Sequence, residues 1–525
     1  MKISIPAFIK TDPSWSAFLA FAFLVNISMP LARIALLCCL FLSIANRNRR
    51  KAFQVSAPFF GWLFYLVFAL AITGLIVACS QDVENLLSQF AAVKPRRLPF
   101  VPQWRLDMME AIRESGVTSS GGIWDYLPDA FIEPFRRAGT DMYTDPVSGL
   151  RKITKLLWYV AIPVALLQVD SRPRLLKSLR AFLYGGVLMA LSVIIVNPIG
   201  AAFQMLFPTA YEVEAGTASP FSTFLYRVVD QFGSLENVNK WIYTRGRAET
   251  FSLALIKLGT MQAAQRLMTS VPVAICLLFE SIAVQKRLSL KNHRPILRDI
   301  LILLIVLIGL LLTCKRGPVI AAAVVSGFLL LLRLRLRYAI LLLLAVFAIG
   351  ASIPQVRTRF VELPSEFELR RGGRAMMWTC IVPKLHEEYP MGIGFRALTY
   401  NKMRAIDNHI EQNQNHVHSV PLQAFVEFGY LGVFAYLLWM GLTFYATGRL
   451  ALRSRRKINS SLPETMAFAA PLAMFSTLFL YGLVEYNLAD SEIVLLYAFA
   501  MGLTNRNLLH SVPAIPLPPP TDPAK

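Results

Sequence analysis

The sequence contains few charged residues for its length. Asp, Glu, Lys and Arg make up only 16% of the 525 residues, whereas soluble globular chains carry about a quarter. Hydrophobic residues make up 55% and form repeated long runs, while the short alternating segments of a membrane β-barrel are missing from the sequence. These features exclude a soluble globular protein and predict an all-α polytopic membrane protein.

Cysteine and histidine are also scarce, with six residues of each kind. Most cysteines lie inside apolar runs and none forms a Cys-x-x-Cys pair, which is typical of small core residues rather than of a disulfide or metal framework. A zinc site at His409, His416 and His418 is an alternative, but no His-Glu-x-x-His motif or clustered Cys and Asp ligands accompany these histidines. We therefore predict no metal and no other cofactor.

Apolar windows of about 15 to 25 residues predict about twelve membrane-spanning helices. These windows lie near 15–28, 30–45, 56–79, 153–169, 179–206, 268–285, 299–314, 317–332, 338–353, 421–447, 466–485 and 490–504. The first two windows share one apolar run, which is interrupted between Asn26 and Pro30. We therefore expect a tight hairpin or a broken helix at that interruption.

The formal net charge of +21 follows the expected membrane topology. With the N-terminus in the cytoplasm, every predicted inner loop is basic, namely NRNRRK, DSRPRLLK, QKRLSLKNHRPILR, RLRLR and GRLALRSRRK. This is the pattern that the positive-inside rule requires, so we predict no nucleic-acid partner and place both termini in the cytoplasm. Three long segments, 80–150, 208–266 and 354–420, then lie on the outer side, where loops of such length are usually functional or disordered.

The stretch NHVHSVPLQAFVEFGYLG carries two histidines where the third outer segment enters a span. His418 and a serine are followed by nine residues and then by a Gly-x-x-Gly pair, Gly429 and Gly432, with Glu427 in the interval. His416 lies two residues before His418. A polar pair at the membrane interface is the alternative interpretation of both histidines.

Two further residue types in this stretch have expected roles. The Glu427 carboxylate lies about two turns into a span, where a charge is costly unless it is paired. We expect it to orient His418 or an arginine, or to hydrogen bond to a neighbouring helix. Gly429 and Gly432 are expected to permit close helix packing.

Arginine-bearing patterns precede the histidines. The segment GGRAMMWTCIVPKLHEEYPMGIGF places Arg374 four residues before Trp378, and a proline with two closely spaced glycines follows. Further upstream, TCKRGPVIAAAVV carries Arg316 in a tight outer turn, and YTRGRAETF carries Arg245 and Arg247 in an outer loop.

Two of these arginines have alternative interpretations. Arg316 could reach toward lipid headgroups as an ordinary interfacial arginine. Arg374 could form a helix-surface ion pair with Glu366 or Glu368.

Together, these segments resemble the bacterial O-antigen ligase and O-antigen polymerase (ligase-related) membrane protein family. The resemblance implies a helical architecture like that of the polyprenyl-phosphate-sugar (GT-C-like) glycosyltransferases, with an active site at the periplasmic face of a bacterial inner membrane. It divides the chain into an N-terminal transmembrane region, 1–240, with the large periplasmic loop 80–150; a ligase-related catalytic membrane region, 241–505, with the periplasmic loop 354–420; and a Pro-rich disordered cytoplasmic tail, 506–525.

The resemblance also implies an activity. A metal-independent inverting glycosyltransferase would move a glycan from undecaprenyl diphosphate to an acceptor sugar, either lipid A–core or a growing glycan. Imidazole suits the general base because it titrates near neutral pH, and guanidinium suits diphosphate because it stays charged and binds oxygen pairs. The implied site residues are His418 as the base, Arg316, Arg374, Arg245 and Arg247 as diphosphate ligands, and His416, Glu427, Gly429 and Gly432 as supporting residues.

Three other activities remain open. A polymerase would join repeat units of O-antigen or exopolysaccharide, whereas a ligase attaches finished glycan; the motif at His418 favours the ligase. A flippase for lipid-linked sugars belongs to another class, but it usually has short outer loops, unlike this chain. A non-catalytic membrane scaffold does not explain the histidine spacing. In every case the expected partners include membrane lipids.

Overall fold

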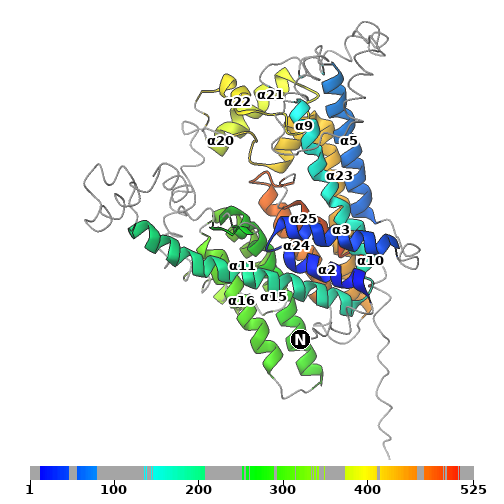
Figure 1. The fold of residues 1–525 in the computed structure, drawn as a ribbon, viewed down its shortest axis with the longest axis vertical. Helices are drawn as coiled ribbons and strands as arrows, with labels where there is room; N and C mark the ends of the chain where they lie inside the picture. Colours follow the sequence, from blue (N-terminus) through cyan, green and yellow to red (C-terminus); the bar gives the residue numbers. More distant parts are fainter. Residues whose placement is uncertain are drawn as a thin grey trace, which may run out of the picture. The chain divides into compact units, whose positions relative to one another are not determined.

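The computed structural model describes residues 12–45, 56–79, 144–206, 251–288, 293–332, 373–457 and 466–505, with short gaps inside these ranges, and scattered positions elsewhere. The chain forms two compact units, drawn as ribbons in Figure 1. Unit 1 comprises Met1–Gly61, Trp158–Leu363 and Met440–Lys525, and unit 2 comprises Trp62–Leu157 and Pro364–Trp439. The predicted division at residues 240 and 505 stays a prediction.

Helices make up almost all of the regular structure in the described residues. Unit 1 holds α2 (Pro13–Leu24), α3 (Met29–Ala45), α10 (Ala161–Gln168), α11 (Arg172–Leu206), α15 (Thr260–Leu288), α16 (Arg294–Leu312), α17 (Arg316–Leu331), α24 (Met466–Gly482) and α25 (Val494–Gly502). Unit 2 holds α9 (Pro146–Lys152), α20 (Arg374–Met376), the π-helix η5 (Met377–Ile381), α21 (Val382–Glu388) and α22 (Tyr400–Ile406). Residues of α5 (Ala57–Cys79), the 3₁₀-helix η2 (Ile153–Val160) and α23 (Val420–Lys457) belong to both units.

The helices confirm a polytopic helical membrane protein. Within the described ranges, five helices are long and apolar enough to cross a membrane, namely Ala57–Val77, Arg172–Ile195, Met261–Gln285, Arg294–Leu312 and Val420–Leu452. Four shorter apolar helices add to these: Pro13–Leu24, Met29–Ala45, Arg316–Leu331 and Met466–Gly482. Each of these helices overlaps a predicted span, and the total of about twelve spans stays a prediction.

One element departs from the all-α expectation. Strands β1 (Phe251–Leu253) and β2 (Ile256–Leu258) pair antiparallel, with Phe251 opposite Leu258. They lie in the predicted outer segment 208–266, where apolar windows give no signal for so short a ribbon. The difference is therefore local and leaves the helical class unchanged.

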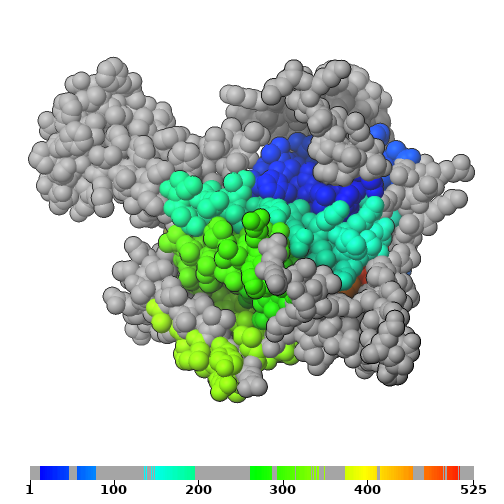
Figure 2. Space-filling model, turned by 90° about the horizontal axis from the view of Figure 1, so that it is seen from below, coloured from blue at the N-terminus to red at the C-terminus, as the bar shows by residue number. Residues whose placement is uncertain are grey.

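Helix α15 is the centre of unit 1. It packs against α11, α16, α17 and α24, and its side chains are largely buried along the span Met261–Gln285. Figure 2 shows α11 in the same unit, between α2 and α3 on one side and α15 and α16 on the other.

The interrupted run between α2 and α3 forms a tight hairpin, which is one of the two alternatives that the sequence predicted. The backbone N–H groups of Ile27 and Ser28 both donate to the carbonyl oxygen of Leu24, at 2.9 and 2.8 Å. The buried Arg266 of α15 donates from Nη1 to the Ile27 carbonyl oxygen at 3.1 Å, and Asn26 donates to the Phe182 carbonyl oxygen at 2.7 Å. A carbonyl at a helix end needs such a partner in apolar surroundings, so Arg266 completes the hairpin.

Replacing Arg266 with alanine should destabilise unit 1. The change removes a charged donor from the buried Ile27 carbonyl, a loss of about 1.5–3 kcal/mol. Thermal unfolding in detergent should show a clearly lower midpoint. The exposed Arg337, whose guanidinium contacts the Tyr338 hydroxyl at 3.1 Å, provides the control, because Arg337→Ala should change stability by less than about 0.5 kcal/mol. Equal shifts in the two variants would contradict the role given to Arg266.

Candidate active site

The site in unit 2 is built on a break in α23. Gly429 has a non-helical backbone inside this helix, with φ 62° and ψ −155°, a region that only glycine adopts readily. Next to the break, the carbonyl oxygens of Val426 and Glu427 accept hydrogen bonds from the backbone N–H groups of Ile393 and Gly394, at 3.1 and 2.9 Å.

The two glycine-bearing motifs therefore contact each other. Gly392 has φ 85°, and a Cβ atom there would overlap the Glu427 carbonyl. A Cβ atom at Gly429 would overlap the Pro390 carbonyl, and one at Gly432 would overlap the Ala424 carbonyl and the Phe428 side chain. Gly429 thus permits close packing against the loop that follows Pro390, rather than against another helix.

Glu427 connects the same loop to the histidine segment. Its side chain is only 1% exposed, and Oε1 accepts the backbone N–H of Arg396 and Nε2 of Gln423, both at 2.9 Å. Gln423 in turn accepts the backbone N–H of Val417 through Oε1 at 3.0 Å. Glu427 was expected to orient His418 or an arginine, or to bond to a neighbouring helix. In the structure it binds an arginine, Arg396, but through the backbone N–H of that arginine rather than through its guanidinium.

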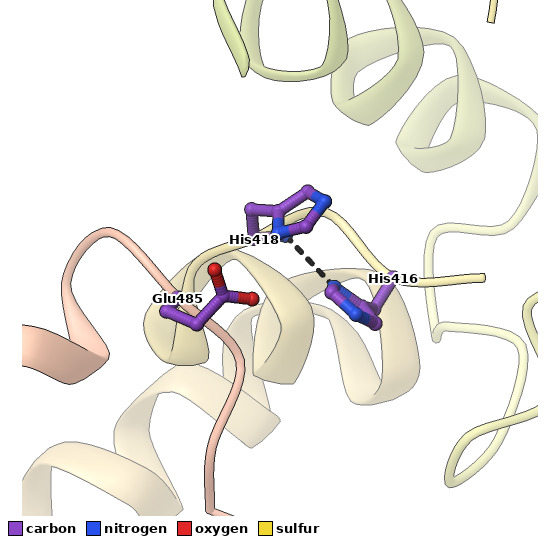
Figure 3. A group of neighbouring side chains, drawn as sticks. All are labelled: His416, His418 and Glu485. Atoms are coloured by element: carbon purple, nitrogen blue, oxygen red, sulfur yellow. Dashed lines mark hydrogen bonds between the residues drawn. The ribbon is translucent and has the colours of Figure 1, made fainter. Parts of the chain in front are cut away.

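His416 and His418 lie side by side at the start of α23 (Figure 3). The ring centroids are 4.3 Å apart, and the His418 backbone N–H donates to Nδ1 of His416 at 3.3 Å. Nε2 of His418 lies 2.7 Å from Oε1 of Gln414. Both histidines are half-buried, so their rings are neither sealed in the core nor fully in solvent.

His418 also has a strained backbone. Its φ is +50°, and Arg396 is the other non-glycine residue with positive φ in the described part of the chain. A non-glycine residue in this region costs about 1–3 kcal/mol and persists only where the surroundings impose it. One contact that holds this backbone in place is the hydrogen bond from Nε1 of Trp378 to the Val417 carbonyl oxygen, at 2.8 Å.

Arg374 belongs to the same unit as the histidines. It is the first residue of α20, and the π-helix η5 that follows carries Trp378. The arginine and tryptophan of one predicted motif are thus held on a single short helical run, and the tryptophan contacts the histidine segment directly.

Arg316 lies in unit 1, as the first residue of α17. Gly317 beside it allows α17 to approach Tyr481 of α24, because a Cβ atom there would lie 2.9 Å from the Tyr481 ring. Tyr481 is buried and accepts a hydrogen bond from Gln265 at 3.3 Å. The assignment of Arg316 to the same site as His418 stays a prediction.

Several predicted residues lie outside the described part of the chain. These are Arg245, Arg247, His409, Glu366 and Glu368, most of the loop 80–150 and all of the tail 506–525 except Leu508.

Sequence reasoning missed three residues that shape the site. Gln423 could have been found, because it lies four residues before Glu427 on the same helix face. Gln414 and Arg396 follow no periodicity, and their contacts with His418 and Glu427 depend on the loop path.

These features define a helical membrane protein whose polar site combines histidine, arginine and a buried carboxylate at a broken helix. The family model described as O-antigen ligase matches residues 301–437. That segment contains Arg316, Arg374, His416, His418, Glu427, Gly429 and Gly432. The match confirms the predicted resemblance to the O-antigen ligase family over this segment. No curated protein matches the chain.

Replacing Gly429 with alanine should disrupt the site. The Cβ atom would overlap the Pro390 carbonyl, and the backbone strain alone costs about 1–3 kcal/mol. Limited trypsin digestion should therefore cut faster after Arg396 and Lys402. Gly441 of the same helix has no heavy atom within 4 Å of an added Cβ, so Gly441→Ala should leave the digestion unchanged. Unchanged digestion of the Gly429 variant would contradict the proposed packing.

Two substitutions of Glu427 should differ. Alanine leaves the N–H groups of Arg396 and Gln423 without an acceptor, at a cost of about 1–3 kcal/mol for each buried group. Glutamine keeps an acceptor oxygen, so Glu427→Gln should lower the unfolding midpoint less than Glu427→Ala. Thermal unfolding in detergent measures both midpoints, and equal decreases in the two variants, which both lack the charge, would show that the charge matters more than the acceptor oxygen.

Proposed function

We propose that the protein is a glycosyltransferase of the O-antigen ligase type, which moves a glycan from a polyprenyl diphosphate carrier to an acceptor sugar. The observation that carries the proposal is the strained backbone of His418 within the segment that matches the ligase family. Trp378, on the same short helical run as Arg374, binds the residue before this histidine. In this proposal the carrier is undecaprenyl diphosphate, and the acceptor is lipid A–core or a growing glycan.

His418 acts as the general base in the proposed reaction. Because an amide oxygen can only accept a hydrogen bond, the Nε2–H group of His418 donates to Oε1 of Gln414. The neutral imidazole then has its lone pair on Nδ1, which removes the proton from the attacking hydroxyl. A base placed in this way contributes about 10²–10⁴-fold to the rate.

The bond changes follow from direct displacement. The acceptor oxygen forms a bond to the anomeric carbon of the donor glycan, while the bond from that carbon to the diphosphate oxygen breaks. The electron pair leaves with the diphosphate, and the configuration of the anomeric carbon inverts. Arg374 neutralises the leaving diphosphate as a paired hydrogen-bond donor, so no metal is part of the proposal. Arg316, Arg245 and Arg247 are proposed for the same task from the sequence.

The proposed setting is the periplasmic face of a bacterial inner membrane, in lipopolysaccharide or exopolysaccharide biosynthesis. It rests on the basic character of the loops assigned to the cytoplasm. A GT-C-like arrangement of about twelve spans belongs to the same proposal.

The glycan phenotype of His418 variants tests the function. Asparagine tolerates positive φ better than alanine does, so His418→Asn separates the loss of the base from the loss of the backbone conformation. The His418→Ala and His418→Asn variants should both show a glycan transfer rate that is lower by about 10²–10⁴-fold, while both still insert in the membrane. Lipid-linked glycans and surface polysaccharide would be compared by gel electrophoresis and mass spectrometry.

The accumulated lipid-linked product distinguishes the two activities. Full-length glycan on the carrier indicates a ligase, and single repeat units indicate a polymerase. His293, the N-cap residue of α16, belongs to none of the motifs and provides the control His293→Ala, which should behave as the wild type. Normal surface glycan in a well-inserted His418→Asn variant would contradict the proposed base.

A further inference from the structure

The turn that follows the closely spaced glycines of unit 2 contains an arginine at its most restricted position. The backbone N–H of Ala397 donates to the Gly394 carbonyl oxygen at 3.3 Å, which closes a turn over Phe395 and Arg396. Arg396 is the third residue of this turn, and its φ is +47°. Glycine or asparagine is favoured at such a position, because a side chain strains the backbone there.

The same loop uses glycine at its other positions of positive φ. Gly392 and Gly394 have φ values of 85° and 90°, where a residue without a side chain costs least. Residues of other types persist in this region where the surroundings impose it, and they cluster at functional sites. The strain at Arg396 therefore indicates a function of its side chain.

Residues of three helices in unit 2 impose this conformation. Oε1 of the buried Glu427 in α23 accepts the Arg396 backbone N–H at 2.9 Å, and Nζ of Lys152 in α9 donates to the Arg396 carbonyl oxygen at 3.2 Å. In α5, Oγ1 of Thr73 accepts the backbone N–H of Phe395 at 3.0 Å. Charged side chains thus hold both polar backbone groups of Arg396, which fixes the point from which its half-buried side chain starts.

Glu427 also connects this turn to the proposed base. Its Oε1 accepts Nε2 of Gln423 at 2.9 Å, and Gln423 accepts the backbone N–H of Val417, the residue before His418. In the described part of the chain, Arg396 and His418 are the two non-glycine residues with positive φ. One buried carboxylate therefore supports both strained residues.

The chemistry of the Arg396 side chain restricts its ligand. A guanidinium stays charged at any relevant pH and binds two oxygens of a carboxylate or a phosphate at once. In the proposed reaction His418 takes the proton of the acceptor hydroxyl, whereas Arg374 neutralises the diphosphate of the donor. An anionic group bound at the turn that shares Glu427 with the base therefore belongs to the acceptor.

We propose that Arg396 is a specificity-determining residue that binds an acidic group, a carboxylate or a phosphate, of the acceptor glycan. The inference deepens the proposed function, because it rests on His418 as the base, and it adds that the acceptor is an anionic glycan.

Substitutions of Arg396 first test whether its side chain serves the fold. Glycine and alanine both remove the guanidinium, but only glycine relieves the positive φ. The unfolding midpoint of Arg396→Gly in detergent should therefore equal or exceed that of the wild type, and it should exceed that of Arg396→Ala. A clearly lower midpoint of Arg396→Gly than of the wild type would show that the guanidinium holds the fold, and it would overturn the proposal.

Binding of the acceptor is the direct test. The probe is the acceptor glycan of the host, isolated from cells that lack the protein and released from its lipid by mild acid. Isothermal titration calorimetry on full-length protein in lipid nanodiscs compares three preparations: untreated, dephosphorylated, and with its carboxylates reduced to alcohols. For the wild type, one of the two treatments should raise Kd by about tenfold or more, because a charge-assisted paired contact is lost. The treatment that does so distinguishes a phosphate from a carboxylate.

The variants then assign the contact to Arg396. With the untreated acceptor, Arg396→Gly should show the same rise in Kd, and the effective treatment should raise it no further. Arg404, an exposed arginine of α22 in the same unit, provides the control, because Arg404→Ala should bind like the wild type. A wild-type Kd that neither treatment changes contradicts the proposal, and so does an Arg396→Gly variant that binds the untreated acceptor like the wild type.

Transfer assays separate this inference from the proposed function. If the enzyme transfers glycan, Arg396→Gly should raise KM for the untreated acceptor about as much as it raises Kd, with kcat close to that of the wild type. Charge-dependent binding through Arg396 without any transfer by the wild type would support the anionic-glycan site and contradict the proposed function. Transfer that depends on His418, but neither on Arg396 nor on the acidic groups, would support the function and sink this inference.

Discussion

The break of α23 at Gly429 is the constraint on which the rest of the site depends. A membrane helix cannot leave backbone carbonyls unpaired in apolar surroundings. Next to the break, the loop after Pro390 donates to the carbonyl oxygens of Val426 and Glu427 through the backbone N–H groups of Ile393 and Gly394. Since a side chain at Gly392 or Gly429 would collide with the partner backbone, the two motifs can only contact each other as glycines.

The buried Glu427 extends this constraint to the histidines. It binds Gln423, and Gln423 binds the backbone of Val417, one residue before His418. Trp378 binds the carbonyl of the same Val417. The backbone N–H and the carbonyl of Val417 are therefore both held by side chains. These two bonds explain how His418 keeps a positive φ although it is not a glycine.

The sequence predicted the helices well because apolar runs report burial in lipid directly. An interruption after Leu24 was also predictable, since Asn26 and Pro30 interrupt an otherwise continuous run, but this pattern fits a broken helix as well as a hairpin. Helix ends were less accurate: α11 begins at Arg172 rather than near residue 179, because long basic side chains let a helix continue past its apolar window. The contacts of the glycines and the contact between Gln414 and His418 could not be predicted. They depend on the path of a loop, and a loop has no periodic sequence pattern.

Buried cations and buried carboxylates have different tasks in this fold. Arg266 completes the α2–α3 hairpin by donating to its carbonyl oxygens, and Glu427 joins α23 to the loop after Pro390 by accepting the backbone N–H of Arg396. Each charge thus pairs with backbone groups of opposite partial charge, where hydrogen bonds to a charged group are stronger than neutral ones. A single ionisable residue inside such a membrane helix can accordingly be structural. Function is better sought where ionisable groups, backbone strain and a family motif coincide, as they do at His418.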